Sequence, residues 1–440
     1  MNLSKRIILV MTLLITFIYI LSNPLIALAV NKETQAVPEI SSDAAILIDS
    51  TTGKVLYGKN ENDKLYPAST TKILTAILAI EKCNLTDKIT ATYNAVMSIP
   101  SGYSNAAIQP DEALTVQELL DLFLIHSANE VGYIFAEHIS GSVENFADLM
   151  NQKAAELGCT NTHFTNPSGI HDDNHYSTAY DMALIAKYCM KNETFRNIVS
   201  KTSCTVEATD KYEKRYFKNT NDLIIPSSNY YYEDAIGVKT GYTTQAKSCL
   251  IAASSKDNLE LITVVLGAKP LENRYVDTIN LFEYGYSNYK MQEIASKDSV
   301  VEEITVENAT KNTKTLPLLI KNSITGLTDI NFDLSNLDYT VDLNENISAP
   351  ISEGTVLGKV TYNIDGITYS SDLIASHNVE RSNLAVLIVQ IILAIIVLFI
   401  LSKLLSPKSH SKKKKSNGGK SKSKKNRKYK KHSDSIYKFN

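Results

Sequence analysis

Residues 69–82 read STTKILTAILAIEK and give the clearest structural signal in the chain. The run lacks Gly and Pro and is almost wholly apolar after Lys72, so we predict a buried helix of about three turns beginning at Ser69. Ser69 and Lys72 are three residues apart and therefore share a helix face. The positive end of the helix dipole favours negative charge at Ser69. Because a hydroxyl is a weak nucleophile without an adjacent base, Lys72 is the candidate base.

A lysine can act as a base at neutral pH only if its pKa falls from about 10.4 toward roughly 7–8. Burial of Lys72 against the apolar helix and a second cation at Lys239 both lower the pKa of Lys72. The simpler alternative is that Ser69 only caps the helix and that Lys72 is a surface charge. Two further motifs argue against that alternative.

The second motif, Ser127-Ala128-Asn129, follows the apolar run 119–126, which we predict to be another helix. The end of this helix then presents Ser127 and Asn129 as polar groups in apolar surroundings. Ser127 suits a proton relay between Lys72 and a leaving group, and Asn129 suits a substrate amide. Ordinary helix-capping residues are the alternative for this motif taken alone.

The third motif, Lys239-Thr240-Gly241, begins a region of small and β-branched residues, 235–267, with a turn at 256–258. We predict antiparallel strands here. Lys239 and Thr240 suit a substrate carboxylate, and Gly241 permits close approach of a ligand. The backbone N–H groups of Ser69 and Tyr242 are the natural donors to an oxyanion. The predicted substrate-binding residues are Asn129, Lys239, Thr240, Gly241, Tyr242 and Thr243.

In this order, S-x-x-K, S-x-N and K-T-G are the set typical of penicillin-binding proteins and class A β-lactamases. Over residues 40–290 the chain resembles the serine-type D-alanyl-D-alanine carboxypeptidases, the low-molecular-weight penicillin-binding proteins, and segments 164–183 and 273–286 are also similar to that family. The resemblance implies an α/β (α+β) fold, a β-lactamase- and transpeptidase-like antiparallel sheet flanked by helices. It further implies that an acyl-enzyme on Ser69 removes the terminal D-alanine from peptidoglycan stem pentapeptides, and that β-lactams acylate the same serine.

The chain departs from the family pattern near the predicted cleft. Ala128 stands where Gly is usual, Glu130-Val131 replaces Asp-Ala, and Lys247 replaces Gly. These changes leave the predicted nucleophile, base and carboxylate site intact, but leave rate and substrate preference open. A segment of the E-x-x-L-N kind is missing from the sequence, so we expect no efficient β-lactam hydrolysis. D,D-endopeptidase activity and a catalytically weak penicillin-binding scaffold remain alternatives.

Metal and cofactor sites are not expected. His171 and His175 lie close to Asp172, Asp173 and Asp181, but their spacing matches no standard zinc motif, so we predict structural roles for them in a loop. The five cysteines have no paired spacing and specify no disulfide, and Cys249 is predicted to be a small core residue.

Both ends of the chain indicate export and membrane anchoring. Lys5-Arg6, an apolar run and Ala27-Leu28-Ala29 predict a signal peptide over residues 1–29, with an uncleaved N-terminal anchor as the alternative. Residues 384–405 are almost continuously apolar and uncharged before Lys403, which predicts a transmembrane helix.

The last segment, 406–440, is predicted to be a disordered basic tail in the cytoplasm, with the catalytic domain on the extracytoplasmic face of the cell membrane. Residues 408–440 contain 14 Lys or Arg and one acidic residue, so the net charge of −2 leaves −15 on the remainder. That acidic remainder disfavours nucleic acid as a ligand, and anionic lipid is the simpler partner for the tail.

Between these ends we predict two domains. Residues 30–290 form the catalytic domain, large enough for a substantial core. Residues 296–376 alternate at strand period and contain Asp365-Gly366, a strong hairpin signal, so we predict a small all-β domain, a β-sandwich stalk. A spacer that holds the active site above the membrane is the favoured role, and a docking module is the alternative.

Overall fold

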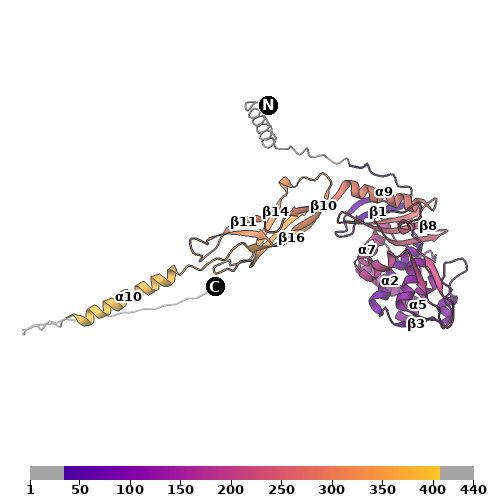
Figure 1. Ribbon diagram of the computed structural model, residues 1–440, viewed down its shortest axis with the longest axis horizontal. Coiled ribbons are helices and arrows are strands. Elements are labelled where there is room, and N and C mark those ends of the chain that lie inside the picture. The colour runs from indigo at the N-terminus through magenta and orange to yellow at the C-terminus, as the bar shows by residue number, and fades with distance from the viewer. Residues whose placement is uncertain (1–33, 407–440) are drawn as a thin grey trace, which may run out of the picture.

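A five-stranded antiparallel sheet with helices on both faces organises the first part of the chain (Figure 1). The computed structural model describes residues 34–406, so the predicted signal peptide and all of the basic tail after Ser406 lie outside the described residues. The strand order is β2-β1-β9-β8-β7. The strands are β1 Ala44–Asp49, β2 Val55–Lys59, β7 Ala235–Thr243, β8 Lys247–Lys256 and β9 Leu259–Ala268.

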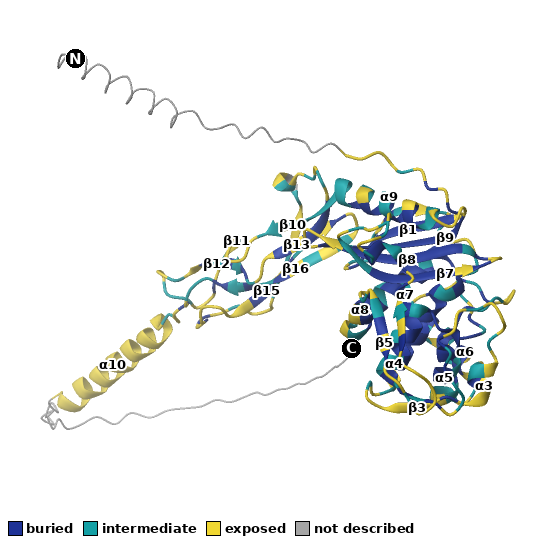
Figure 2. Cartoon of the chain, turned by 45° about the vertical axis from the view of Figure 1, so that its right-hand side comes forward, coloured by how far each residue is buried: buried dark blue, intermediate teal, exposed yellow. Residues whose placement is uncertain are grey.

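Alternate residues of the central strands enter two separate cores. In β1, Ile46 and Ile48 face the core beneath the helical region, whereas Ala45 and Leu47 face the core under the C-terminal helix of this domain. Burial on both faces explains why β1 is an uninterrupted apolar run rather than an alternating one. Figure 2 shows the strands as the most deeply buried layer.

The helical region lies mostly on one face of the sheet, and α9 covers the other face (Figure 2). The helices and helical turns are η1 Ala68–Thr71, α2 Lys72–Lys82, α3 Tyr93–Met97, α4 Val116–Asp121, η2 Leu122–His126, α5 Asn129–Ser140, α6 Val143–Glu156, α7 Ala179–Met190, α8 Glu193–Val199, η3 Asp222–Ile224 and α9 Asn273–Asn288. Two short ribbons complete this part, β3 Lys88–Thr90 with β4 Ala113–Thr115, and β5 Ser203–Val206 with β6 Arg215–Lys218.

Two helix predictions need correction. Ser69 lies in the 3-10 turn η1, which continues directly into α2, so the α-helix begins at Lys72 rather than at Ser69. Such turns are common at helix N-termini. The run 119–126 is not one α-helix, because α4 ends at Asp121 and a π-helical turn, η2, follows. The antiparallel strands predicted at 235–267 are confirmed as β7, β8 and β9.

The second part of the chain is all-β, as predicted. Its five-stranded antiparallel sheet has the order β11-β12-β16-β15-β14, and a two-stranded ribbon, β10-β13, lies beside it. The predicted hairpin joins β15 to β16, and both turn residues have positive φ, 51° at Asp365 and 81° at Gly366, as a type I′ turn requires. The elements are β10 Tyr289–Ala295, β11 Val300–Thr305, β12 Thr315–Ile320, β13 Ile324–Asp329, η4 Leu334–Asn336, β14 Tyr339–Leu343, β15 Val356–Ile364 and β16 Ile367–Ala375.

The helix α10, Leu384–Leu405, extends away from both domains (Figure 1). It has 22 residues, and none of its side chains is buried. Within residues 34–406 it is the one helix long and apolar enough to cross a membrane. The predicted architecture is therefore confirmed: a mixed sheet-and-helix domain, a small all-β domain and a C-terminal apolar helix.

Candidate active site

Ser69 and Lys72 meet at the junction of η1 and α2. The lysine side chain is fully buried, and its Nζ lies 2.8 Å from Ser69 Oγ. Ala68, immediately before the serine, has a φ of 50°, a left-handed conformation that a non-glycine residue adopts only when its surroundings enforce it. The one-turn spacing in the sequence therefore corresponds to a direct hydrogen bond.

The lysine amine has two further partners, and both are oxygens that can only accept. Lys72 Nζ lies 2.7 Å from Asn129 Oδ1 and 2.6 Å from the Ser168 carbonyl oxygen. A neutral amine has two N–H donors and one lone pair. If the two N–H groups serve the amide and carbonyl oxygens, the lone pair remains for the Ser69 hydroxyl. The three contacts thus direct the lone pair of a neutral Lys72 toward Ser69 Oγ.

The electrostatic surroundings favour that neutral form. Burial, and next the charge of Lys239, hold the pKa of Lys72 well below its ordinary value. Both effects were predicted from the sequence. They act in the direction that a general base requires.

The residues of the second motif lie on two elements rather than at the end of one helix. After the π-helical turn η2, Ser127 adopts a left-handed φ of 69°, and Asn129 begins α5. Asn129 Nδ2 donates to the Ser104 carbonyl oxygen at 2.7 Å, which fixes the amide so that its oxygen faces Lys72. Ser127 is nearly buried and lines the same cleft as Ser69.

Strand β7 brings the third motif against η1. A Cβ on Gly241 would lie 3.1 Å from the Ser69 nitrogen, so the strand passes close to Ser69. Lys239 is buried and donates to the Thr240 carbonyl oxygen at 3.0 Å. Burial, and then the charge of Arg274, lower the pKa of Lys239 to about 7. Thr240 Oγ1 lies 2.7 Å from Thr220 Oγ1.

An open cleft joins the three motifs. Six residues not predicted as site residues also line it, of which Arg274 adds a second cation beside Lys239. The predicted residue Thr243 is not among the lining residues, and its hydroxyl accepts the Ala246 N–H in the turn between β7 and β8. The lining residues are Ser69, Gly102, Tyr103, Ser104, His126, Ser127, Asn129, Thr220, Thr240, Gly241, Tyr242 and Arg274.

The guanidinium of Arg274 is held by its neighbour in α9. Its Nη2 lies 3.0 Å from the Tyr275 hydroxyl, which in turn contacts the Thr220 carbonyl oxygen at 3.1 Å. The segment 273–275 was noted in the sequence only for its similarity to a family. Because this segment is more than 200 residues from Ser69 in the sequence, its position in the cleft could not be predicted from spacing.

The polar loop 164–175 packs against η1. Asn166 Oδ1 accepts N–H groups of Ser168, Gly169 and Ile170 at 2.8–3.2 Å, which fixes the carbonyl that contacts Lys72. A Cβ on Gly169, whose φ is 76°, would lie 1.8 Å from the Ala68 carbonyl oxygen, so only glycine fits.

His175 has a structural place in this loop. Its Nε2 lies 2.8 Å from Thr71 Oγ1, and its Nδ1 accepts the Thr165 N–H at 3.1 Å. Burial lowers the pKa of His175 to about 3. Both ring nitrogens therefore bond to the protein, and the neutral imidazole supports the turn that contains Ser69.

Comparisons with known proteins agree with this geometry. Residues 31–270 match the family model for D-alanyl-D-alanine carboxypeptidase, and residues 289–381 match that of the penicillin-binding protein 5 C-terminal domain. The chain is 36% identical over 339 residues to D-alanyl-D-alanine carboxypeptidase DacF of Bacillus subtilis (strain 168), covering 76% of this chain and 84% of that protein. For D-alanyl-D-alanine carboxypeptidase DacC of Escherichia coli (strain K12), the identity is 31% over 363 residues, covering 80% and 87%.

Solved structures give the same result. Penicillin binding protein 5 from Haemophilus influenzae superimposes with a TM-score of 0.61 at 28% identity, covering 79% of this chain and 100% of that structure. The Streptomyces K15 DD-transpeptidase superimposes with a TM-score of 0.54 at 30% identity, covering 57% of this chain and all of its own. Fold and site therefore define a penicillin-binding protein of the serine peptidase class. The chain belongs to the D-alanyl-D-alanine carboxypeptidase family and is a hydrolase of that family.

Proposed function

We propose that this protein removes the terminal D-alanine from peptidoglycan stem pentapeptides through an acyl-enzyme on Ser69. The observation that carries the proposal is the 2.8 Å contact between Lys72 Nζ and Ser69 Oγ in a buried site that favours the neutral amine. That arrangement activates a serine hydroxyl without histidine.

The chemistry follows from the positions of the side chains. Lys72 takes the proton of Ser69, whose Oγ attacks the carbonyl carbon of the penultimate D-alanine. The backbone N–H groups of Ser69 and Tyr242 stabilise the oxyanion, at about 2.7–4 kcal/mol for each donor. Ser127 relays that proton from Lys72 to the departing amine of the terminal D-alanine, which restores the neutral lysine. Water then hydrolyses the ester, and a β-lactam acylates the same oxygen.

Substrate orientation depends on the cationic side of the cleft. Lys239 and Arg274 supply positive charge beside Thr240, and the hydroxyl of Thr240 offers a hydrogen bond to a carboxylate. We propose that these groups bind the free carboxylate of the terminal D-alanine. Asn129 and Gly241 contribute contacts to the peptide amide and backbone, and Thr243 supports the strand. The mechanism needs no metal and no cofactor.

We also propose a membrane-anchored arrangement. The helix α10 spans the membrane, the catalytic domain at 30–290 lies on the extracytoplasmic face, and the basic tail 406–440 lies in the cytoplasm, because basic flanks stay on that side. The all-β domain at 296–376 acts as the spacer between them. Anionic lipid is the proposed partner of the tail, and nucleic acid is not a ligand.

The test is to incubate the full-length protein, in mild detergent, with a peptide ending in D-Ala-D-Ala and to measure released D-alanine. We expect release from the wild type and none from Ser69→Ala. Mass spectrometry after penicillin treatment should locate the adduct on Ser69. A protein that is acylated but releases no D-alanine would be the scaffold of the alternative hypothesis. Release of peptides from cross-linked dimers instead would indicate an endopeptidase.

A further inference from the structure

A segment without helix or strand forms one wall of the cleft. We call residues 98–112, between α3 and β4, the rim segment; three of its residues, Gly102, Tyr103 and Ser104, line the cleft. A long irregular segment has no backbone ladder to hold it in place. Its position therefore comes from single contacts with other elements, made partly by backbone groups such as the Asn129 N–H and partly by side chains.

The rim segment controls the amide that contacts the candidate base. The Ser104 carbonyl oxygen accepts two hydrogen bonds from Asn129, one from the backbone N–H at 3.0 Å and one from Nδ2 at 2.7 Å. The oxygen of the same amide contacts Lys72. A shift of Ser104 therefore moves Asn129 and one of the two acceptors that orient the lysine.

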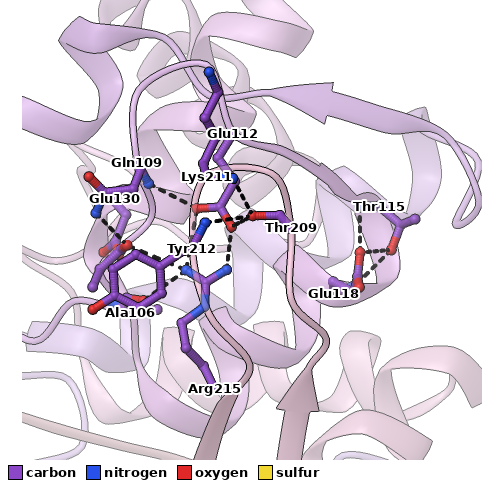
Figure 3. A network of polar contacts seen from close by, with 11 residues as sticks. Ala106, Gln109, Glu112, Thr115, Glu118, Glu130, Thr209, Lys211, Tyr212 and Arg215 are labelled. Carbon is purple, nitrogen blue, oxygen red and sulfur yellow. Dashed lines mark hydrogen bonds and ion pairs between the residues drawn. The ribbon is translucent and has the colours of Figure 1, made fainter.

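Two residues beyond Ser104, the backbone N–H and carbonyl groups of Ala106 form hydrogen bonds with two side chains of opposite charge. Glu130 Oε1, on α5, accepts the Ala106 N–H at 2.6 Å. Arg215 Nη1, on β6, donates to the Ala106 carbonyl oxygen at 3.2 Å and to the Ala107 carbonyl oxygen at 3.4 Å. Figure 3 shows the guanidinium and the carboxylate reaching this turn from different elements. Hydrogen bonds to ionised groups are roughly twice as strong as those between neutral groups.

The guanidinium is itself fixed by a buried carboxylate of the rim segment. Arg215 Nη2 bonds to Glu112 Oε1, and Nη1 lies 3.4 Å from Glu112 Oε2 (Figure 3). Glu112 also accepts from Thr209 Oγ1 and from the Gln109 N–H, both at 2.9 Å. Glu112 has no exposed surface and Arg215 is 7% exposed, so solvent does not screen the pair.

We propose that Arg215 and Glu112 are positioning residues, which hold the rim segment so that Ser104 and Asn129 keep Lys72 aligned with Ser69. The inference rests on the proposed function and extends it to residues that touch neither substrate nor reacting atoms. A purely structural ion pair would affect stability alone. A positioning pair also changes the rate per folded molecule, since displacement of a catalytic group by about 1 Å can lower a rate on the order of 100-fold.

The test compares Arg215→Lys with Arg196→Lys in the full-length protein. A lysine at 215 keeps the charge opposite Glu112 but lacks the fork that reaches the carbonyl oxygens of Ala106 and Ala107. Arg196 forms a more exposed ion pair with Glu260, 2.6 Å away, and has no hydrogen bond to the rim segment. A double variant, Glu112→Gln with Arg215→Met, removes both charges and leaves neither one buried alone.

Three quantities are measured: the rate of acylation by a fluorescent penicillin per acylatable site, D-alanine release, and hydrogen exchange of peptides from 98–112. For Arg215→Lys and the double variant we expect acylation and release to fall on the order of 10-fold to 100-fold, with faster exchange in the rim segment. For Arg196→Lys we expect both rates within about twofold of the wild type, whatever its melting temperature.

Rates per site that stay within twofold for Arg215→Lys, or that fall equally for Arg196→Lys, would overturn the inference. Failure of the proposed function is a separate result. A wild type that is acylated but releases no D-alanine contradicts the carboxypeptidase proposal, and the relative acylation rates still decide whether the pair is a positioning device. If the wild type is not acylated, Ser69 is not the nucleophile and the inference fails together with the proposed function, whereas unchanged acylation in Arg215→Lys overturns the inference alone.

Discussion

Replacement of Lys72 by Met tests the reaction most directly. Methionine preserves the length of the side chain and its packing on α2, but it removes the amine that lies 2.8 Å from Ser69 Oγ. Among the described residues, Lys72 is the one amine hydrogen-bonded to that oxygen. The variant therefore lacks the proposed proton acceptor, while the proposed oxyanion donors and the cationic side of the cleft stay in place.

The expected loss follows from the role of a general base. Such groups contribute about 10²–10⁴-fold to a rate. At 1.36 kcal/mol for each factor of ten, the barrier to acylation should rise by about 2.7–5.4 kcal/mol. The variant also leaves Asn129 Oδ1 and the Ser168 carbonyl oxygen without the amine, at about 1–3 kcal/mol for each unpaired acceptor, offset by removal of a buried amine. Rates must therefore be normalised to folded protein.

The assay is stopped-flow acylation by a fluorescent penicillin, with D-alanine release in parallel and across a range of pH. In the proposed mechanism the neutral form of Lys72 is the base, so the wild-type rate should rise as the pH increases through the lowered pKa of this lysine. The matched control is Lys187→Met. Burial also lowers the pKa of Lys187, but this residue lies on α7 and does not line the cleft. We expect its rate within about twofold of the wild type.

A Lys72→Met protein that is acylated within fivefold of the wild-type rate, with the same pH profile, would refute the reasoning. The base would then have to be another group of the cleft. A loss equal to that of Lys187→Met would have the same meaning.

Three further predictions use other parts of the molecule. Because the pKa of Lys239 is about 7, its charge is lost as the pH rises through that value. The KM for peptides with a free C-terminal carboxylate should therefore increase above pH 7. In Lys239→Arg this KM should stay nearly constant, as measured by D-alanine release. Gly169→Ala should unfold at a clearly lower urea concentration than Gly141→Ala, because its Cβ would lie 1.8 Å from the Ala68 carbonyl oxygen. In Gly141→Ala the Cβ meets no atom within 4 Å, so this variant carries only left-handed backbone strain of about 1–2 kcal/mol. Equal urea midpoints would contradict the packing argument. A chain ending before residue 384 should appear in the soluble fraction of lysed cells, and its retention on carbonate-washed membranes would exclude α10 as the sole anchor.

Much of this fold was determined by local patterns in the sequence. The apolar run after Lys72 became α2, the region of small and β-branched residues at 235–267 became the antiparallel strands β7, β8 and β9, and Asp365-Gly366 became the predicted hairpin turn. Periodicity and turn chemistry act over a few residues, so these elements could be predicted before any contact was known. The order of the three motifs likewise indicated the family without a structure.

Other features were decided only when distant segments came together. The contacts of Lys72 with Asn129 and Ser168 span 57 and 96 residues of sequence, and the hydrogen bond from Arg215 to the rim segment spans more than 100 residues. The π-helical turn after α4 and the left-handed Ser127 had no signal in the sequence pattern, and the place of Arg274 in the cleft depended on where α9 lies on the sheet. Spacing along a chain records which residues share a face of one element. The packing of the whole domain decides which faces meet and which buried charges pair, because only there do burial and opposite charge act together.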